Sequence, residues 1–422
     1  MKTAGIIAEY NPFHNGHKYQ LEEVRTQTGA DYMIIAMSGD FLQRGVPAIV
    51  DKYTRTRMAL SCGADLVLEL PAVWACSSAE YFAAGGVQLL GKTGVVNQIC
   101  YGSEKVNQTL IHTLTDTLCN KHQIVSDMIS AFQKEGLSYP AARSQAMCAL
   151  LPEIHPSEIT SFLATPNNIL ALEYEKSIAR WNATNDHRLS GYAIQRIGEG
   201  YHSCRLEGSY VSATAIRKQL FQSDSTDESL PRQLAGTMPA AARDLLAHSA
   251  RNHLLLDTDD FSAMLYARLW SFADTGYEIF ADCNAELSNK IKRNLNHFPG
   301  YTQFAQLLKS KNLTYARICR VLLHILLDIK QEDYLRIGTG SCIPYLRILG
   351  FRKEAAPLLS AIKKKASVPL VTKVADASNI LDADAQSLFS IDIKVADLYR
   401  TVASLHCQKQ FPNEYEQGPV IL

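Results

Sequence analysis

Two histidines three residues apart are the side chains in this sequence best suited to chemistry. They are His14 and His17, in the run NPFHNGH at residues 11–17. Imidazoles can donate hydrogen bonds to phosphate oxygens whose charge grows when the α-phosphorus of a nucleotide is attacked. Gly16, between them, has no Cβ and lets the backbone approach a ligand closely. The run therefore predicts a phosphate-binding loop.

The elements around this run favour that interpretation. A short apolar stretch at residues 3–8 has the pattern of a buried strand, and residues 17–28 have the pattern of a helix. A helix N-terminus offers free backbone N–H groups and the positive end of the helix dipole, both of which favour phosphate. Surface histidines, a metal site or a helix cap would also explain the pair. Metal binding is less favoured, because no nearby Cys or His supplies a third ligand at the usual spacing.

A second group of polar side chains stands in the run VSATAIRK at residues 211–218. Ser212 is a good helix N-cap, and that role alone needs no function. A cap does not explain the second hydroxyl at Thr214 or the cations at Arg217 and Lys218, which suit a polyphosphate tail. We therefore expect Ser212, Thr214 and Arg217 to hold the β- and γ-phosphates of a nucleotide.

Short apolar runs alternate with amphipathic stretches over the first hundred residues. The runs that read as strands are residues 3–8, 32–37, 66–70 and 95–101, and the helical stretches are residues 17–28, 52–62 and 78–90. This alternation predicts an α/β fold with a Rossmann-like parallel sheet whose ligands bind at the carboxyl ends of the strands. After residue 103 the pattern is mainly helical, apart from a possible strand at residues 191–197 before a helix at 213–221.

The length of 422 residues predicts two domains. The polar, acidic segment at residues 222–229 lacks apolar periodicity, and we place the boundary there. Residues 1–222 form the expected α/β domain, and residues 230–422 form the expected helical, basic domain.

Composition narrows the class of protein. Hydrophobic residues make up 47% of the chain and charged residues 20%, a balance typical of globular proteins. The ten cysteines form no CxxC pair, and neither a secretory signal nor a bilayer-spanning apolar run is evident. We expect a soluble, cytoplasmic protein without a membrane partner. The 42 basic and 42 acidic residues cancel, so the total charge gives no hint of a nucleic-acid partner.

Basic residues gather in the second half of the chain. Residues 287–327 contain no acidic residue, and Tyr301, Phe304 and Tyr315 are interleaved with seven basic residues: Lys290, Lys292, Arg293, Lys309, Lys311, Arg317 and Arg320. Residues 336–375 add eight basic residues against Glu354 alone. Such stretches suit an RNA backbone and unstacked bases, although a charge run is often only a solvated helix face. We expect Arg317, Arg320 and His324 on a second face of one helix, with Arg317 and Arg320 exposed opposite its apolar face.

Six motifs occur together in order along the chain: EYNPFHNGH, MSGDFLQRG, DLVLELP, YGSE, TPNNILALEY and SATAIR. In this order they resemble the bacterial tRNA(Met) cytidine acetate ligase family, within the HxGH nucleotidyltransferase superfamily. The resemblance covers most of the chain. It implies that residues 1–222 are a nucleotidyltransferase-like domain that activates ATP and acetate, and that residues 230–422 are a tRNA-binding domain. It implies that acetate is activated with ATP to acetyl-adenylate, with release of pyrophosphate. The acetyl group then passes to N4 of the wobble cytidine of elongator tRNA(Met).

The resemblance also implies an ATP site. Its residues are Ile7, Ala8, Glu9, Tyr10, Asn11, Pro12, Phe13, His14, Asn15, Gly16, His17, Lys18, Tyr19, Gln20, Gly102, Asn167, Asn168 and Arg196. Other interpretations remain open for four of these positions. Gly102 is also explained as a turn glycine, Asn167 and Asn168 as the start of a helix, and Arg196 as a surface residue.

The ligands follow from the same resemblance. We expect ATP as a substrate, with Mg²⁺ held mainly by ATP and water and no metal ligand from the protein. The partners are acetate and tRNA, and no DNA is expected. Acetate needs only a small apolar pocket with one or two donors, so the sequence does not name the residues of that pocket.

Two other functions compete with acetate ligation. One is an adenylyltransferase acting on a phosphorylated small molecule, which would not need about 190 further residues carrying basic, aromatic-studded helices. The other is a non-catalytic RNA-binding protein, which would not need both the HNGH and the SATAIR motifs. Acetate ligation explains both halves of the chain.

Overall fold

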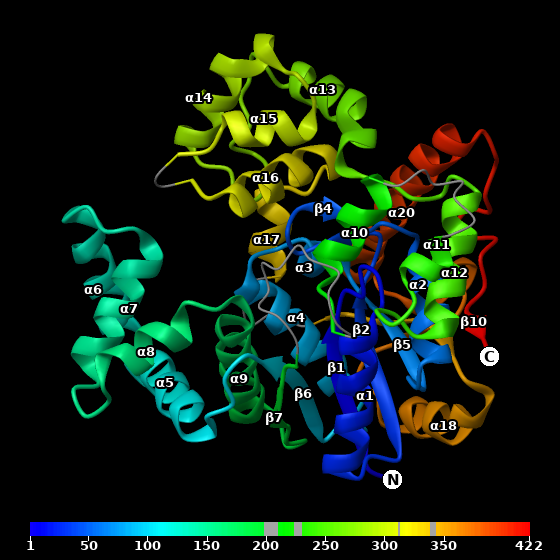
Figure 1. Ribbon diagram of the computed structural model, residues 1–422, viewed down its shortest axis with the longest axis horizontal. Helices are drawn as coiled ribbons and strands as arrows, with labels where there is room; N and C mark the ends of the chain where they lie inside the picture. Colours follow the sequence, from blue (N-terminus) through cyan, green and yellow to red (C-terminus); the bar gives the residue numbers. More distant parts are fainter. Residues whose placement is uncertain (198–209, 223–229, 311–312, 338–342) are drawn as a thin grey trace.

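The computed structural model describes residues 1–197, 210–222, 230–310, 313–337 and 343–422. In these residues one large sheet organises the molecule (Figure 1). Its strands are β1 (Thr3–Ala8), β2 (Tyr32–Ser38), β5 (Leu66–Leu70), β6 (Gln98–Ser103), β7 (Ser190–Gln195), β8 (Leu346–Phe351), β9 (Leu370–Val371) and β10 (Val420–Ile421). A separate antiparallel hairpin consists of β3 (Phe41–Leu42) and β4 (Val46–Pro47).

The α-helices connect and cover these strands. Those before β7 are α1 (Asn15–Thr28), α2 (Lys52–Ser61), α3 (Ala72–Ala75), α4 (Ala79–Lys92), α5 (Gln108–Asn120), α6 (His122–Lys134), α7 (Tyr139–Leu150), α8 (Pro156–Leu163) and α9 (Pro166–Thr184). Those after β7 are α10 (Ala213–Gln222), α11 (Leu230–Gln233), α12 (Ala240–Arg251), α13 (Ser262–Ser271), α14 (Ala285–Asn294), α15 (Tyr301–Leu307), α16 (Tyr315–Leu327), α17 (Gln331–Ile337), α18 (Ala356–Lys365), α19 (Ala377–Ile380) and α20 (Ala383–Cys407).

The strand order of the sheet is β10-β8-β5-β2-β1-β6-β7, and β9 also pairs with β8. The five strands from β5 to β7 are mutually parallel. The chain extends from β1 to β2 and β5 on one side, then crosses to β6 and β7 on the other. The order reverses between β1 and β6, and in open α/β sheets ligands bind outside the carboxyl ends of the strands at such a switch point. The predicted α/β, Rossmann-like fold class is confirmed.

Both faces of the sheet are buried, as the apolar strands require. Successive residues of β2 point to opposite faces. Met33 and Ile35 belong to a core with residues of α1, α2, α10 and α12, whereas Ile34 and Ala36 belong to a core with residues of α4, α5 and α9. Helices on both faces hold β1 and β6 rigidly, so the loops at their carboxyl ends have a fixed support.

Most of the predicted element boundaries agree with the structure to within three residues. β1 and β5 have the predicted bounds, and α1 begins two residues earlier than expected because His14 caps it. The largest shift among the first strands is in β6, expected at residues 95–101 and found at Gln98–Ser103. Val95 and Val96 are buried, but they lie in the irregular segment before the strand.

Three strands of the sheet come from the second half of the chain. β8 pairs antiparallel with β5, and β9 and β10 pair parallel with β8. The second half is therefore mainly helical, but its last part extends the sheet of the first half. The division into domains at residues 222–230 stays a prediction. Residues 223–229, which carry the expected boundary, lie outside the described residues.

Two groups of helices lie away from the sheet (Figure 1). One consists of α6, α7 and α8, beyond α5 and α9. The other consists of α13, α14 and α15, above α16 and α17 and far from α18 in this view. The basic end of α18 therefore does not continue the basic stretch at residues 287–327. Among the described residues, no helix combines the length and apolar character needed to cross a bilayer.

The prediction of an exposed basic face on α16 is wrong in part. Arg317 and Arg320 both pair with Asp282, at 3.3 and 3.8 Å, and the Arg320 side chain is only 13% exposed. His324 is fully buried, with ring nitrogens 2.9 Å from the carbonyl oxygen of Ala281 and 3.0 Å from that of Cys76. The helix is enclosed on more than its apolar side, which the spacing of residues within one helix does not reveal.

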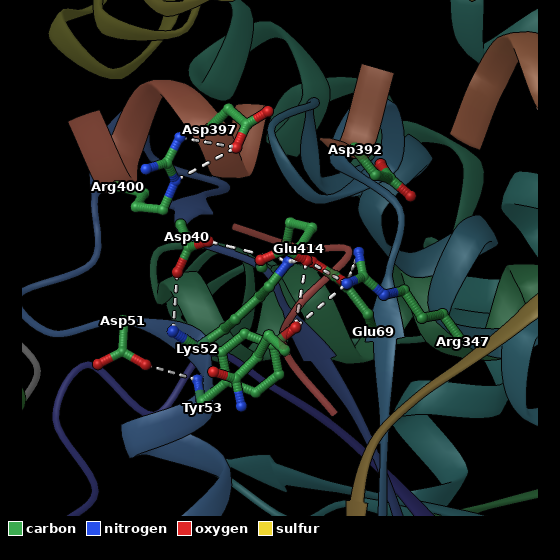
Figure 2. Close-up of polar contacts among 12 residues, drawn as sticks. Asp40, Asp51, Lys52, Tyr53, Glu69, Arg347, Asp392, Asp397, Arg400 and Glu414 are labelled. Atoms are coloured by element: carbon green, nitrogen blue, oxygen red, sulfur yellow. Dashed lines mark hydrogen bonds and ion pairs between the residues drawn. The ribbon is translucent and has the colours of Figure 1, made fainter. Parts of the chain in front are cut away.

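A buried ionic cluster joins the two halves of the chain (Figure 2). It consists of Asp40, Lys52, Glu69, Arg347 and Glu414. Lys52 Nζ lies 2.8 Å from Glu69 and 2.9 Å from Glu414, and Arg347 lies 2.8 Å from Glu69 and pairs with Glu414 as well. Each buried cation thus contacts two carboxylates, as low-dielectric surroundings require.

Candidate nucleotide-binding site

The two histidines of the HNGH motif lie at the switch point of the sheet, His14 in the loop between β1 and α1 and His17 in the first turn of α1. We call residues 9–17 the nucleotide loop. His14 is the N-cap of α1, and its ring stacks on that of His17 with centroids 3.7 Å apart. Tyr10 and Phe13 support the pair, with their ring centroids 4.8 and 5.5 Å from that of His17. The cap and the aromatic contacts fix both imidazoles in place.

Hydrogen bonds fix the tautomer of both rings. His14 Nδ1 accepts from the backbone N–H of Gly16 at 3.0 Å, and His17 Nδ1 accepts from that of His14 at 3.2 Å. A neutral imidazole whose Nδ1 accepts carries its proton on Nε2. Each ring therefore has an Nε2–H group with which to donate to a ligand.

Both imidazoles are neutral near pH 7. Burial, with the positive charges of Arg196 and Arg217, lowers the pKa of His14 to about 3. Burial, His14 and Arg196 lower the pKa of His17 well below its usual value. A neutral imidazole donates a hydrogen bond without adding a buried charge, so the pair can stabilise phosphate charge as it develops.

The free backbone N–H groups expected at the start of α1 are not found, and that expectation was wrong. The Asn15 N–H donates to the carbonyl oxygen of Thr237 at 3.0 Å, and the Gly16 N–H donates to His14. The side chain of Asn15 also donates to the carbonyl oxygen of Gly236 at 2.6 Å. Phosphate binding at this helix stays a prediction, and it would rely mainly on side-chain donors. A Cβ on Gly16 would lie 2.9 Å from the ring of His14, so this glycine makes room for the imidazole.

The structure brings Arg217 of the second motif to the nucleotide loop. Its Nη1 donates to the carbonyl oxygen of Asn11 at 2.6 Å, and its Nη2 to the hydroxyl of Thr214 at 3.2 Å. Ser212 accepts from the N–H of Ala215 at 3.1 Å, as expected for a cap at the start of α10. The two motifs, about 200 residues apart in sequence, are thus neighbours. Contact of these three side chains with the phosphates stays a prediction.

Gly102 and Arg196 are adjacent at the carboxyl ends of β6 and β7. The Arg196 N–H donates to the carbonyl oxygen of Ser103 at 2.9 Å, and a Cβ on Gly102 would lie 3.1 Å from Arg196 Cγ. The positive charge of Arg196 affects the pKa of both histidines, which places it near the pair. No ion pair joins Arg196 to a carboxylate within the described ranges. Its charge faces the same site as His14 and His17.

Asn167 and Asn168 hold the loop that follows β6. Asn168 Oδ1 accepts from the Ser103 hydroxyl at 2.7 Å and from the Glu104 N–H at 3.0 Å, and its side chain is buried. Asn167 donates to the Glu104 carboxylate, which also accepts from the N–H of Asn168 at the start of α9. These bonds give the pair a structural role beside the site. Direct contact of either residue with ATP stays a prediction.

The remaining predicted positions lie around the same loop. Ile7 and Ala8 end β1, and Pro12 lies within the nucleotide loop. Lys18 pairs with Glu22 on the exposed side of α1, and the Tyr19 ring lies 5.9 Å from that of Tyr210. Gln20 follows in the same helix.

The hairpin β3–β4 links the nucleotide loop to the helices beyond the sheet. Glu9 accepts from the N–H of Gln43 at 2.8 Å. Gly45 lies at the hairpin turn with a φ of 76°, and a Cβ there would overlap the backbone of Cys319 and Arg320 in α16. The hairpin thus lies between the loop and α16, and its turn requires a glycine.

Several contacts of the site were not found from the sequence. Gly236 and Thr237 cover the start of α1, although they lie more than 220 residues further along the chain. Glu104 belongs to the YGSE motif, which was noted for its glycine alone. A local sequence pattern does not predict that a backbone carbonyl contacts a distant helix. Glu104 could have been found, because it is an acidic residue in the same motif as Gly102.

Comparisons with known proteins agree with this geometry. A model of the HIGH nucleotidyl transferase family matches residues 1–414. The chain is 35% identical to a tRNA(Met) cytidine acetate ligase of Acetivibrio thermocellus, and the match covers 100% of both proteins. It is 36% identical to a protein of the same name from Clostridium perfringens, again over 100% of both. The chain belongs to the tRNA(Met) cytidine acetate ligase family.

Solved structures of this family have the same fold. The crystal structure of apo Thermotoga maritima TmcAL matches with a TM-score of 0.91 and 27% identity, over 100% of both chains. The structure of the same protein bound with alpha-thio ATP matches with a TM-score of 0.89. The family resemblance inferred from the six motifs is therefore confirmed.

Proposed function

We propose that this protein is an ATP-dependent ligase that joins acetate to N4 of the wobble cytidine of elongator tRNA(Met), through acetyl-adenylate. One observation carries the first half of this proposal. Two neutral Nε2–H imidazoles, Arg196 and Arg217 gather at the switch point of a Rossmann-like sheet. Membership in the ligase family supports the choice of acetate and tRNA.

In the first step an acetate oxygen attacks the α-phosphorus of ATP, and the bond between that phosphorus and the oxygen bridging to the β-phosphate breaks. Pyrophosphate leaves with the bonding electrons. His14 and His17 donate from Nε2 to the α-phosphate oxygens as charge accumulates there. Ser212, Thr214 and Arg217, at the start of α10, hold the β- and γ-phosphates. Magnesium would enter with ATP and would be held mainly by ATP oxygens and water.

In the second step N4 of cytosine attacks the carbonyl carbon of acetyl-adenylate, AMP leaves, and the nitrogen loses one proton. The exocyclic amine is a weak nucleophile, so the mixed anhydride supplies the driving force. The cytidine must leave its stack to reach the nucleotide loop. The helices after residue 230 present it there, while residues 1 to about 222 make the adenylate. A substrate of this kind places the enzyme in the cytoplasm.

The test is an incubation of the full-length protein with ATP, labelled acetate and an elongator tRNA(Met) transcript. We expect pyrophosphate release that depends on acetate, and label on the RNA that depends on ATP. Formate and propionate, offered separately, measure the selectivity for acetate. Pyrophosphate release that requires a phosphorylated small molecule instead of acetate would favour the adenylyltransferase alternative and overturn the proposal.

A further inference from the structure

An aromatic pair on the outer face of α13 is exposed to solvent. Trp270 is 61% exposed and Tyr266 38% exposed. They are four residues apart and therefore lie on the same face of the helix. Their rings are 6.4 Å apart, with 29° between the planes. Two large aromatic rings exposed side by side offer a flat apolar surface on which a ligand can bind.

The pair is held in place from one side. The Tyr266 ring contacts that of Phe298, with centroids 5.3 Å apart, and Phe298 contacts the buried Phe304 at 5.0 Å. Tyr266 is thus anchored to the core of this helical group, whereas Trp270 extends beyond it. A rigid ring and an extended neighbour are suited to receive a flat ligand between or upon them.

Helix α14, which carries basic side chains, contacts the segment that follows α13. Lys292, near the end of α14, donates to the carbonyl oxygen of Asp274, four residues after Trp270, at 3.1 Å. Arg293 follows it and is exposed, and Lys290 donates to the carbonyl oxygen of Lys309 at 3.0 Å. Glu278 lies near Lys292. No ion pair links Lys290 or Arg293 to a carboxylate in the part of the chain that the structure describes.

We infer that Trp270 and Tyr266 form a platform on which an unpaired base of RNA stacks, and that Lys290 and Arg293 of the neighbouring helix α14 attract the RNA backbone. Bases stack on aromatic side chains whatever their sequence, and unneutralised cations attract the RNA backbone. The inference rests on the proposed tRNA substrate and adds the surface that binds it. The hairpin turn at Gly45 contacts α16, against which α13 and α15 pack, and this links the helical group to the nucleotide loop.

Tryptophan fluorescence gives a direct readout, because Trp74 and Trp181 are buried and Trp270 is exposed. An elongator tRNA(Met) transcript should quench the emission of the full-length protein, and most of this quenching should be absent in Trp270→Phe. Trp270→Ala should weaken tRNA binding by about 5- to 150-fold, the usual range for loss of one stacked base. Trp270→Phe should retain most of the affinity.

Two controls separate this inference from the proposed function. Tyr139→Ala removes a similarly exposed ring on α7, in the other helical group, and should leave tRNA binding unchanged. Acetate-dependent pyrophosphate exchange should be unchanged in all three variants.

If wild-type protein acetylates tRNA and Trp270→Ala binds tRNA as tightly as wild type does, the proposed platform is wrong while the proposed function stands. If Trp270→Ala instead changes the mass of the protein in light scattering and leaves tRNA affinity unchanged, the pair is a subunit contact and the inference is overturned. Wild-type protein that neither binds nor acetylates tRNA would overturn the proposed function itself.

Discussion

The nucleotide loop and the ionic cluster are both buried groups of titratable side chains, but they treat charge in opposite ways. In the ionic cluster, Lys52 and Arg347 each pair with Glu69 and Glu414, so the charges are compensated within the protein. In the nucleotide loop, His14 and His17 are neutral and hold their protons on Nε2. Charges that are paired within the protein stabilise the fold. Neutral hydrogen-bond donors are suited to a reaction in which negative charge develops on the substrate.

The largest expected effect on the cluster comes from Arg347→Met. It leaves two buried carboxylates with Lys52 as their remaining cation, and breaking a buried pair typically costs about 3–5 kcal/mol of unfolding free energy. Arg400→Met is the matched control, because Arg400 pairs with Asp397 at the surface, where an ion pair contributes about 0–1 kcal/mol. Denaturant unfolding measures both. Equal losses of unfolding free energy in the two variants would show that the buried cluster stabilises the fold no more than a surface ion pair does.

The corresponding change in the nucleotide loop is His17→Ala. Removing one preorganised donor typically lowers the rate by about 100- to 1,000-fold, so we expect acetate-dependent pyrophosphate exchange to fall by that factor. His14→Ala should have a smaller effect on exchange. Binding of tRNA should stay nearly intact in both variants. His122→Ala, which changes an exposed histidine of α6, is the control for a general effect. Wild-type exchange in folded His17→Ala would exclude the catalytic role.

A smaller effect should follow from Arg217→Ala. If its guanidinium holds the phosphate tail, the variant should bind ATP at least about tenfold more weakly, because hydrogen bonds to charged groups contribute about 1.5–3 kcal/mol. AMP, which lacks the β- and γ-phosphates, should be affected much less. Competition binding compares the two nucleotides. Equal losses would mean that Arg217 acts only through its bond to the carbonyl oxygen of Asn11, as a structural residue of the loop.

The smallest expected effect is that neither His14 nor His17 changes its protonation state near neutral pH. The pKa of His14 is lowered to about 3, chiefly by burial, and that of His17 well below its usual value. Histidine NMR spectra, assigned with His14→Gln, should therefore show both rings as the Nε2–H tautomer without change from pH 8 to 6. The unfolded chain binds a proton near pH 6.5. The stability that neutral His14 contributes is thus present above pH 6.5 and is lost as pH falls toward 3. A midpoint near 6.5 in the folded protein would contradict this account.

The same comparison shows what the sequence could predict. The nucleotide loop was found because its residues are consecutive and follow a strand whose apolar pattern set the bounds of β1. The ionic cluster was not found, because Lys52 and Glu414 are far apart in sequence and no periodicity joins them. For the same reason Arg347, in the missed strand β8, was counted among basic residues for RNA although it is buried. Local patterns predicted elements and motifs, while pairings between distant segments decided which charges are exposed.

The most direct test of the central claim is to look for acetyl-adenylate in the absence of RNA. Wild-type protein at high concentration is mixed with ATP and ¹³C-labelled acetate, quenched in acid, and analysed by mass spectrometry together with released pyrophosphate. Our account predicts labelled acetyl-adenylate in amounts that match the pyrophosphate, and about 100- to 1,000-fold slower formation of both in His17→Ala. Acetylation of tRNA by the same preparation without any labelled adenylate, or adenylate formed equally fast by His17→Ala, would contradict it.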